Sequence, residues 1–169
     1  MDGSFFYQSP IGILKITQSG DAIAGICFVQ GDDSRGQDFY SPGSFKPTTV
    51  LMEDCKQKLD RYFSGDLFEF DLRLLQPGTA FRQSVWNELV KIRYGKTESY
   101  LSLSRKLGNV KAIRAVGTAN GKNNIAIVVP CHRVIGSNGS LIGYAGELWR
   151  KKWLLDHEAK YASGVQTLF

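Results

Sequence analysis

Three short apolar runs, separated by turn-forming residues, occupy the first 30 positions of the chain. The runs span residues 5–8, 13–17 and 22–29. Pro10 and Gly12 lie in the first gap and Gly20 in the second, and these residue types favour tight turns. The pattern predicts a β-meander.

A helical period follows the meander. Apolar side chains recur at helical spacing from Thr49 to Phe63, and Gly65 ends the predicted helix. The apolar positions are Leu51, Cys55, Leu59 and Tyr62 or Phe63. Residues 31–48 are polar and rich in Gly, Ser and Pro, which predicts a long loop, whereas the alternating residues 68–72 predict one more strand.

From residue 79 the pattern is mostly helical. Thr79, Ser99 and Asn109 are each suited to cap a helix, and the third of these helices is predicted to run to Gly121. The second and third helices, joined by a Gly-Asn turn, have the proportions of a helix-turn-helix. The apolar run 124–130 predicts a buried extended segment leading to Cys131, and a last helix is expected over roughly 147–160.

Gln76, Pro77 and Gly78 form the best candidate linker. We therefore expect two domains, 1–76 and 77–169. The fold class is α/β (α+β), with a β-meander plus helix in the first domain and a mostly helical second domain that contains the helix-turn-helix.

Charge divides the chain in the same place. The overall net charge is +5, but residues 1–75 carry 7 Lys/Arg and 11 Asp/Glu, a net of −4, and residues 76–169 carry 14 and 5, a net of +9. A basic domain on an acidic protein favours a polyanionic partner, nucleic acid first, while a solvated lysine-rich surface is the alternative. There is no apolar run of about 18 residues and no secretory signal, so we expect no membrane association and a cytoplasmic location, or a nuclear one in a eukaryote.

The cysteines point to thiol chemistry. Three are scattered along the chain, an odd number that argues against a disulfide framework, and no Cys/His spacing suits a zinc site. Cys131 is followed at once by His132 and Arg133, and such neighbours favour the thiolate. Glu158 on the last helix is the plausible acceptor for the second nitrogen of His132. We expect Cys27 and Cys55 to be structural.

The motifs around Cys131 occur together in one known family. PCHRV at 130–134, GYAG at 143–146 and KKWLLDHE at 151–158, with GTAFRQSVWNEL, YGKTESYLSLSRKLGN and AIRAVGTAN upstream, resemble the methylated-DNA–protein-cysteine methyltransferases (O6-alkylguanine-DNA alkyltransferases). The resemblance covers roughly residues 79–158, and SPIGIL and YFSGDLFEF extend it more loosely toward the N-terminus. It implies a ribonuclease-H-like first domain and a DNA repair protein that acts once. Such a protein flips an O6-alkylguanine out of double-stranded DNA and moves the alkyl group irreversibly to its own cysteine; O4-alkylthymine is a second candidate base.

The resemblance also implies residue roles. Cys131 matches the nucleophile, His132 and Glu158 match its relay through a water, Asn123 matches the hinge asparagine and Tyr100 matches the tyrosine that donates to guanine N3. Arg114 matches the finger that replaces the extruded base, and the expected DNA-binding face is completed by Tyr100, Lys111, Ala112, Ala115, Gly117, Thr118 and Ser137. The expected substrate-pocket residues are Val134, Tyr144, Ala145 and Gly146. No metal or diffusible cofactor is implied, because the thiolate is the whole reagent.

Several positions depart from the family pattern. Asn124 and Ala126 stand where Pro is frequent, which predicts a less rigid hinge loop, and Val110 replaces a Pro at the start of the third helix. Glu147 replaces a usual Gly, which puts an acid near the pocket rim. None of these departures removes a reacting group.

Three other functions compete with alkyl transfer. A lesion-recognition protein without transfer would lack the cysteine. A helix-turn-helix regulator would dimerise and read base edges, for which the Ala- and Gly-rich third helix offers few side chains; tight packing of that helix against its own core is the other interpretation of its composition. A Cys-His hydrolase would turn over many times. A monomer is the expected state.

Overall fold

The computed structural model describes residues 2–29 and 41–164 of the chain. It divides into two compact units, Met1–Gln76 and Pro77–Phe169. The first part of the predicted loop 31–48 lies outside the described residues, and the rest contains a short 3-10 helix, η3 (Pro42–Phe45).

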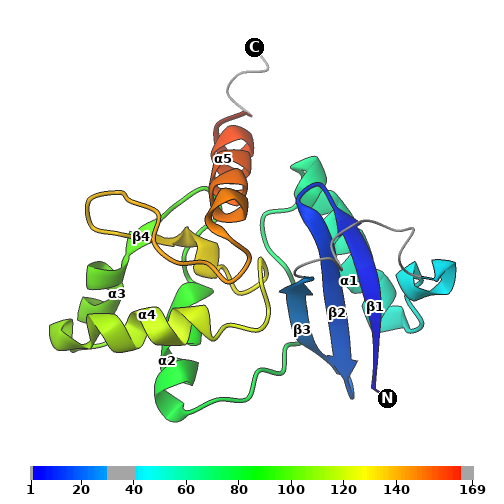
Figure 1. The fold of residues 1–169 in the computed structure, drawn as a ribbon, viewed down its shortest axis with the longest axis horizontal. Coiled ribbons are helices and arrows are strands. Elements are labelled where there is room, and N and C mark those ends of the chain that lie inside the picture. The colour runs from blue at the N-terminus through cyan, green and yellow to red at the C-terminus, as the bar shows by residue number, and fades with distance from the viewer. Residues whose placement is uncertain (1, 30–40, 165–169) are drawn as a thin grey trace. The chain divides into compact units, whose positions relative to one another are not determined.

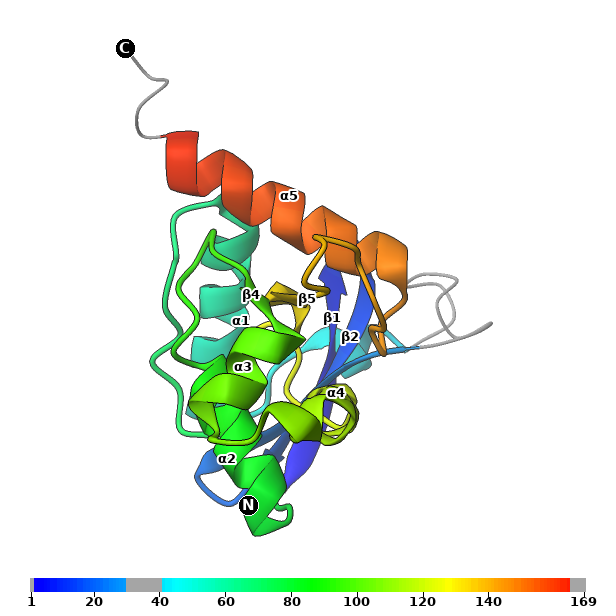
Figure 2. The same ribbon diagram turned by 90° about the vertical axis from the view of Figure 1, so that its left-hand side faces the viewer.

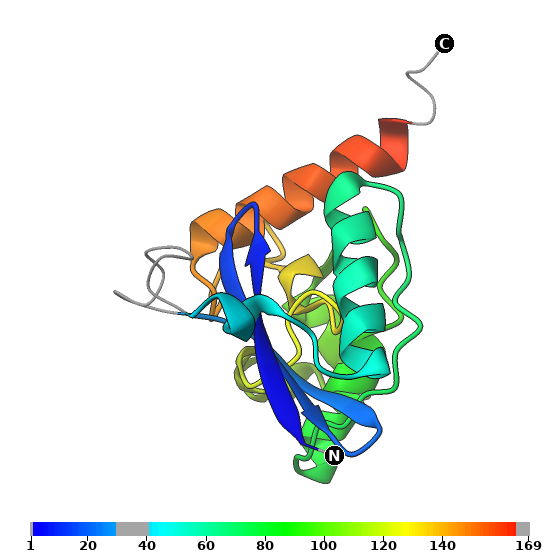
Figure 3. The same ribbon diagram turned by 90° about the vertical axis from the view of Figure 1, so that its right-hand side faces the viewer.

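An antiparallel sheet and one helix build the first unit (Figure 1). Strands β1 (Gly3–Ser9), β2 (Gly12–Ser19) and β3 (Ala22–Phe28) pair in the order β1-β2-β3, which confirms the predicted meander. Helix α1 (Val50–Ser64) begins where the Thr49 side chain accepts a hydrogen bond from the Met52 amide, and it ends at Gly65 with φ 85°. The helix lies beside the sheet (Figure 3) and contacts all three strands, and its buried side chains belong to the core of this unit.

The strand predicted at 68–72 is wrong. The only bridge near it, among the described residues, joins Leu74 to Ile23, where the Ile23 amide donates to Arg73 O (2.8 Å) and the Leu75 amide donates to Ile23 O (2.9 Å). No side chain from 66 to 75 is fully buried, and Phe68 is 43% exposed. The side chains of an extended segment alternate even where no neighbouring strand forms hydrogen bonds with it. The alternation of residues 68–72 was therefore not sufficient to predict a strand.

The second unit is mostly helical (Figure 2), and its helix starts follow the predicted caps. Thr79 caps α2 (Ala80–Leu89) and Ser99 caps α3 (Tyr100–Lys106). Asn109 caps the 3-10 turn η4 (Val110–Ala112), and α4 (Ile113–Gly121) follows it. The third helix thus opens with one 3-10 turn before it becomes α-helical. Helix α4 packs on α2 and α3, and the buried indole of Trp86 donates to Ala119 O at 2.9 Å.

The path to the cysteine differs from the prediction. Residues 124–130 are not extended but turn repeatedly: the Val128 amide donates to Ala126 O (2.8 Å) and the Val129 amide donates to Ile125 O (3.0 Å). These turns bury Ile125, Ile127 and Val129, so the predicted burial is correct although the conformation is not. The short 3-10 helix η5 (Cys131–Arg133) follows, and then β5 (Val134–Ile135), which pairs in parallel with β4 (Glu98–Ser99).

The last helix, α5 (Leu148–Gly164), confirms the expected final helix. The fold class is therefore confirmed, with a small antiparallel sheet and helix in one unit and a helical second unit containing the α3–α4 helix-turn-helix. Within the described ranges no helix is long and apolar enough to cross a membrane.

Candidate active site

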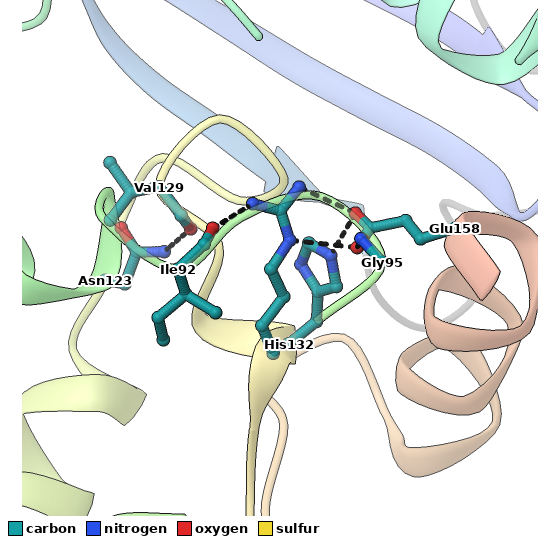
Figure 4. A network of polar contacts seen from close by, with 7 residues as sticks. Ile92, Gly95, Asn123, Val129, His132 and Glu158 are labelled. Carbon is teal, nitrogen blue, oxygen red and sulfur yellow. Dashed lines mark hydrogen bonds and ion pairs between the residues drawn. The ribbon is translucent and has the colours of Figure 1, made fainter. Parts of the chain in front are cut away.

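The loop before Cys131 is held by the side chain of Asn123. Its Nδ2 donates to Val129 O at 2.8 Å, and its Oδ1 accepts from the Ile125 amide at 3.1 Å (Figure 4). Ile127, inside this loop, has φ 72°, a left-handed conformation that strains a β-branched residue. The Asn123 side chain thus ties this loop at two points.

Cys131 lies at the start of η5 and is 7% exposed. Its amide donates to Val129 O at 2.8 Å, and its carbonyl accepts from Asn120 Nδ2 at 3.4 Å. The backbone of the cysteine is therefore fixed from both sides, by the preceding turn and by α4.

A buried carboxylate collects the polar groups that follow Cys131 (Figure 4). His132 Nε2 lies 2.7 Å from Glu158 Oε1. Arg133 donates to the same carboxylate twice, from Nε to Oε2 and from Nη2 to Oε1, each at 2.9 Å. The Gly95 amide donates to Oε2 at 3.3 Å. Helix α5 supplies the carboxylate, η5 supplies the histidine and arginine, and the loop before β4 supplies the amide.

Burial affects the ionisation of each group in this cluster. It raises the pKa of the Cys131 thiol, although Asn123 and Lys151 oppose the rise. Burial also lowers the pKa of His132, against the attraction of Glu158. Hydrogen bonds and charges from His132 and Arg133 outweigh burial and hold the pKa of Glu158 far below its usual range. The sequence placed Arg133 beside the sulfur, but its guanidinium is bound to Glu158 instead.

The second imidazole nitrogen of His132 is open to a small ligand. Nδ1 is buried and has no hydrogen-bond partner among the described residues. A buried polar atom of this kind is commonly satisfied by a water, which suits the relay that the sequence predicted between Cys131 and His132.

Lys151 is a site residue that sequence reasoning missed. Its residue surface is 0% exposed, and Nζ donates to Ile142 O (3.0 Å) and Gly143 O (3.2 Å) and lies 5.8 Å from the centre of the Tyr100 ring. Burial lowers its pKa to about 8, although the nearby Cys131 opposes this. Its spacing offered a signal, because a residue seven positions before Glu158 lies on the same face of a helix.

A small cavity of about 110 Å³ opens at the sulfur. Its lining consists of Tyr100, Gly117, Asn120, Gly121, Asn123, Cys131, Gly143, Tyr144 and Ala145. Of the expected pocket residues, Tyr144 and Ala145 line this cavity, whereas Val134 and Gly146 are buried and do not. The Tyr100 hydroxyl donates to Ile142 O at 3.0 Å. Asn120, Gly121 and Gly143 are lining residues that the sequence did not suggest.

The expected DNA-binding residues lie mostly on the open side of η4 and α4. Arg114, Lys111, Ala115 and Thr118 are exposed there, and Ala112 and Gly117 are partly exposed. Val116 and Ala119 instead face the core of the unit. The small residue Ala115 is therefore not packed into the protein, which disfavours tight core packing as the reason for this composition. Ser137 is exposed in the loop after β5.

Nothing in the described ranges forms a group of three or more His, Cys, Asp or Glu side chains that could hold a metal ion. No disulfide joins any of the three cysteines, all of which lie in the described ranges; Cys27 lies exposed on β3 and Cys55 is buried on α1.

Comparisons with protein families divide the chain in two. Residues 80–160 match the model for the 6-O-methylguanine DNA methyltransferase, DNA binding domain. Residues 5–76 match the model for the ribonuclease-like domain of the same methyltransferase.

Whole proteins match along most of the chain. A methylated-DNA–protein-cysteine methyltransferase of Methanosarcina acetivorans is 41% identical over 152 residues, covering 90% of this chain and 95% of the relative. One from Mycobacterium bovis is 42% identical over 164 residues, covering 96% and 95%. The crystal structure of Mycobacterium tuberculosis OGT in complex with DNA has a TM-score of 0.81 and 39% identity, and covers 94% of this chain and 93% of that one.

Proposed function

The chain belongs to the 6-O-methylguanine DNA methyltransferase family, and we propose that Cys131 is the residue on which its alkyl transfer ends. The protein is a single-turnover methylated-DNA–[protein]-cysteine S-methyltransferase that repairs O6-alkylguanine in double-stranded DNA. One observation carries the assignment: Cys131 lines the cavity and is followed by the His132–Glu158 pair. Cys27 and Cys55 belong to the first unit.

The proton of the thiol leaves through His132. A water at Nδ1 takes the proton from Sγ and passes it to the imidazole, whose Nε2 hydrogen is held by Glu158. The sulfur bonds to the alkyl carbon as the bond from that carbon to guanine O6 breaks, and the electron pair goes to the guanine. The product on the protein is a thioether, which is a poor leaving group, so each molecule acts once.

Tyr100 makes guanine a better leaving group. Burial raises the pKa of its hydroxyl, so it is a proton donor at neutral pH. Without a base it donates to Ile142 O; a bound guanine takes that hydrogen bond at N3. Tyr100 gives its proton to guanine N3 and regains one from the imidazolium of His132. In the net reaction, the proton of the thiol ends on the released guanine.

DNA binds on the exposed side of η4 and α4. The base must leave the stack, which costs a few kcal/mol, and Arg114 offsets part of this by occupying the space of the base. Small side chains such as Ala115 let α4 approach the minor groove. The net charge of +9 on residues 76–169 adds the attraction to phosphates that does not depend on sequence.

We assign the chemistry and DNA binding to residues 77–169 and a structural role to residues 1–76. A cytoplasmic location suits a protein whose three cysteines form no disulfide and one of which is the reagent, because a reducing compartment keeps thiols from oxidising.

Lesion loss from a duplex that contains one O6-methylguanine tests this proposal. With limiting protein, the wild type removes one lesion per molecule and then stops, Cys131→Ser removes none, and the matched variant Cys55→Ser behaves as the wild type. Removal that continues beyond one lesion per molecule would indicate a hydrolase. Tight binding without any removal by the wild type would indicate the recognition-only alternative, and either result would overturn the proposal.

A further inference from the structure

We propose that Asn120 is a specificity-determining residue whose Oδ1 accepts a hydrogen bond from the 2-amino group of the flipped O6-alkylguanine, and that this contact favours guanine lesions over O4-alkylthymine. The inference rests on the proposed function and deepens it, because it concerns which damaged base the cavity at Cys131 accepts.

Asn120 lies where a bound base would contact it. It belongs to the last turn of α4 and is 4% exposed. It lines the cavity at the sulfur together with Cys131 and Tyr100. A side chain that is buried and still borders the cavity can contact only neighbouring protein groups or a molecule inside the cavity.

The nitrogen of the Asn120 amide is engaged by the protein. Nδ2 lies 3.4 Å from Cys131 O, and only the nitrogen can face this atom, because a carbonyl oxygen accepts and does not donate. Burial raises the pKa of the Tyr100 hydroxyl, and a hydrogen bond from the Asn120 side chain opposes the rise, as a donor does. The amide nitrogen therefore faces these two groups, which fixes the orientation of the amide.

The oxygen is the open end of the same amide. Asn120 Oδ1 is buried and has no hydrogen-bond partner among the described residues. A buried acceptor without a donor is costly, and in most proteins a water or a ligand satisfies it. The space that Asn120 borders is the cavity that receives the base under the proposed function, so the donor comes with the base.

O6-alkylguanine offers one suitable group. Alkylation at O6 removes the hydrogen from N1, so within DNA the 2-amino group carries all the N–H hydrogens of the base. This group is bonded to the carbon next to N3, the atom at which the Tyr100 hydroxyl acts under the proposed function. Because Asn120 binds that hydroxyl, its amide lies beside the edge of the base that carries N3 and the 2-amino group.

O4-alkylthymine offers no such donor. Its N3 has lost the hydrogen, and its O2 is an acceptor, as Oδ1 is. Binding of this base leaves the oxygen of Asn120 unsatisfied, and a site with an unpaired buried polar group rejects the ligand that fails to pair with it. Asn120 thereby distinguishes two lesions that carry the same alkyl group.

The test compares methyl transfer from duplexes that contain O6-methylguanine or O6-methylhypoxanthine, which lacks only the 2-amino group. The mass of the peptide that contains Cys131 gives the rate constant for each duplex. The wild type should react about tenfold faster with O6-methylguanine. Asn120→Leu removes the acceptor at nearly constant size and should react with both bases at similar rates, even if both rates fall.

Two further variants separate recognition from structure. Asn120→Asp keeps an acceptor oxygen and should retain the preference for O6-methylguanine, whereas a merely structural role would give both Asn120 variants the wild-type ratio of rates. Asn87→Leu is the matched control, since Asn87 is exposed on α2, and it should behave as the wild type. The costs of extruding the two bases differ, but this difference belongs to the DNA and cancels between protein variants.

A preference that persists in a folded Asn120→Leu would overturn the inference, because another group, such as a backbone carbonyl, would then read the 2-amino group. Equal rates of the wild type on the two purines would overturn it even if Asn120→Leu failed to fold. Asn120→Leu should also narrow the gap between O6-methylguanine and O4-methylthymine, and an unchanged gap would contradict the claim about thymine. Absence of transfer from O6-methylguanine to the wild type would overturn the proposed function itself, whereas the other outcomes leave that function standing.

Discussion

Replacing Lys151 by Met removes a buried positive charge while keeping an unbranched side chain of similar length. The ammonium group is bound to the carbonyls of Ile142 and Gly143, in the loop after β5, and lies close to the Tyr100 ring. The thioether of Met can fill the same space but can neither donate to those carbonyls nor titrate. The variant therefore isolates what the charge does.

The expected size follows from the pKa. Burial lowers the pKa of Lys151 from an ordinary value of about 10.4 to about 8. Because the folded protein binds this proton less tightly than the unfolded chain does, the free energy of unfolding rises with pH across the window between the two values. At about 1.4 kcal/mol per pH unit, the wild type should gain about 2 to 3 kcal/mol between pH 7 and pH 10, relative to Lys151→Met.

Urea unfolding at pH 7 and pH 10, under reducing conditions, measures this difference. Other groups that titrate in this range, such as buried tyrosines, cancel when the two proteins are compared at each pH. Lys152→Met is the matched control, because Lys152 is exposed and paired with Asp156 on the surface. Equal pH dependence of stability in the wild type and Lys151→Met would refute the reasoning, since the pKa of Lys151 would then be the same in the folded and the unfolded protein.

Three further outcomes are expected. Gly95→Ala should lower the free energy of unfolding by about 2 to 4 kcal/mol in urea, because φ is 74° and the new methyl would overlap α5; a loss below about 1 kcal/mol would contradict the packing described. Glu147→Gly should raise the melting temperature, since φ at Glu147 is 75° and a non-glycine residue there is strained by about 1 kcal/mol, whereas Glu147→Ala should give no such gain. Arg114→Ala should weaken binding to a lesion-containing duplex about tenfold or more in a fluorescence anisotropy titration. It should leave the iodoacetamide alkylation of Cys131 unchanged. Equal affinity of the variant and the wild type would show that Arg114 does not contact the DNA.

The local features of the fold could be predicted from the sequence. Thr79, Ser99 and Asn109 each cap the helical segment expected of them, because a cap depends on a few neighbouring residues. The two wrong elements depend on distant partners. Residues 68–72 alternate as a strand does, but no neighbouring strand pairs with them. Residues 124–130 are apolar because they are buried, and a series of turns buries apolar side chains as well as a strand does.

The candidate site shows the same division. The sequence brought Cys131, His132 and Glu158 together through their motifs. It could not show that the Arg133 side chain binds Glu158 rather than the sulfur, or that Lys151 is buried against the loop after β5. Both follow from how α5 packs on η5 and on the loop, and a linear pattern does not encode that packing. The rise in the pKa of the Cys131 thiol follows from the same burial.

The central claim is that the alkyl group ends on Cys131, and intact mass tests it most directly. The protein is incubated with excess duplex that contains O6-methylguanine, and its mass is measured before and after digestion and peptide mapping. The account predicts a gain of one methylene per molecule, carried by the peptide that contains Cys131 and absent in Cys131→Ser. A methyl group on another residue, or repaired DNA with unmodified protein, would contradict it.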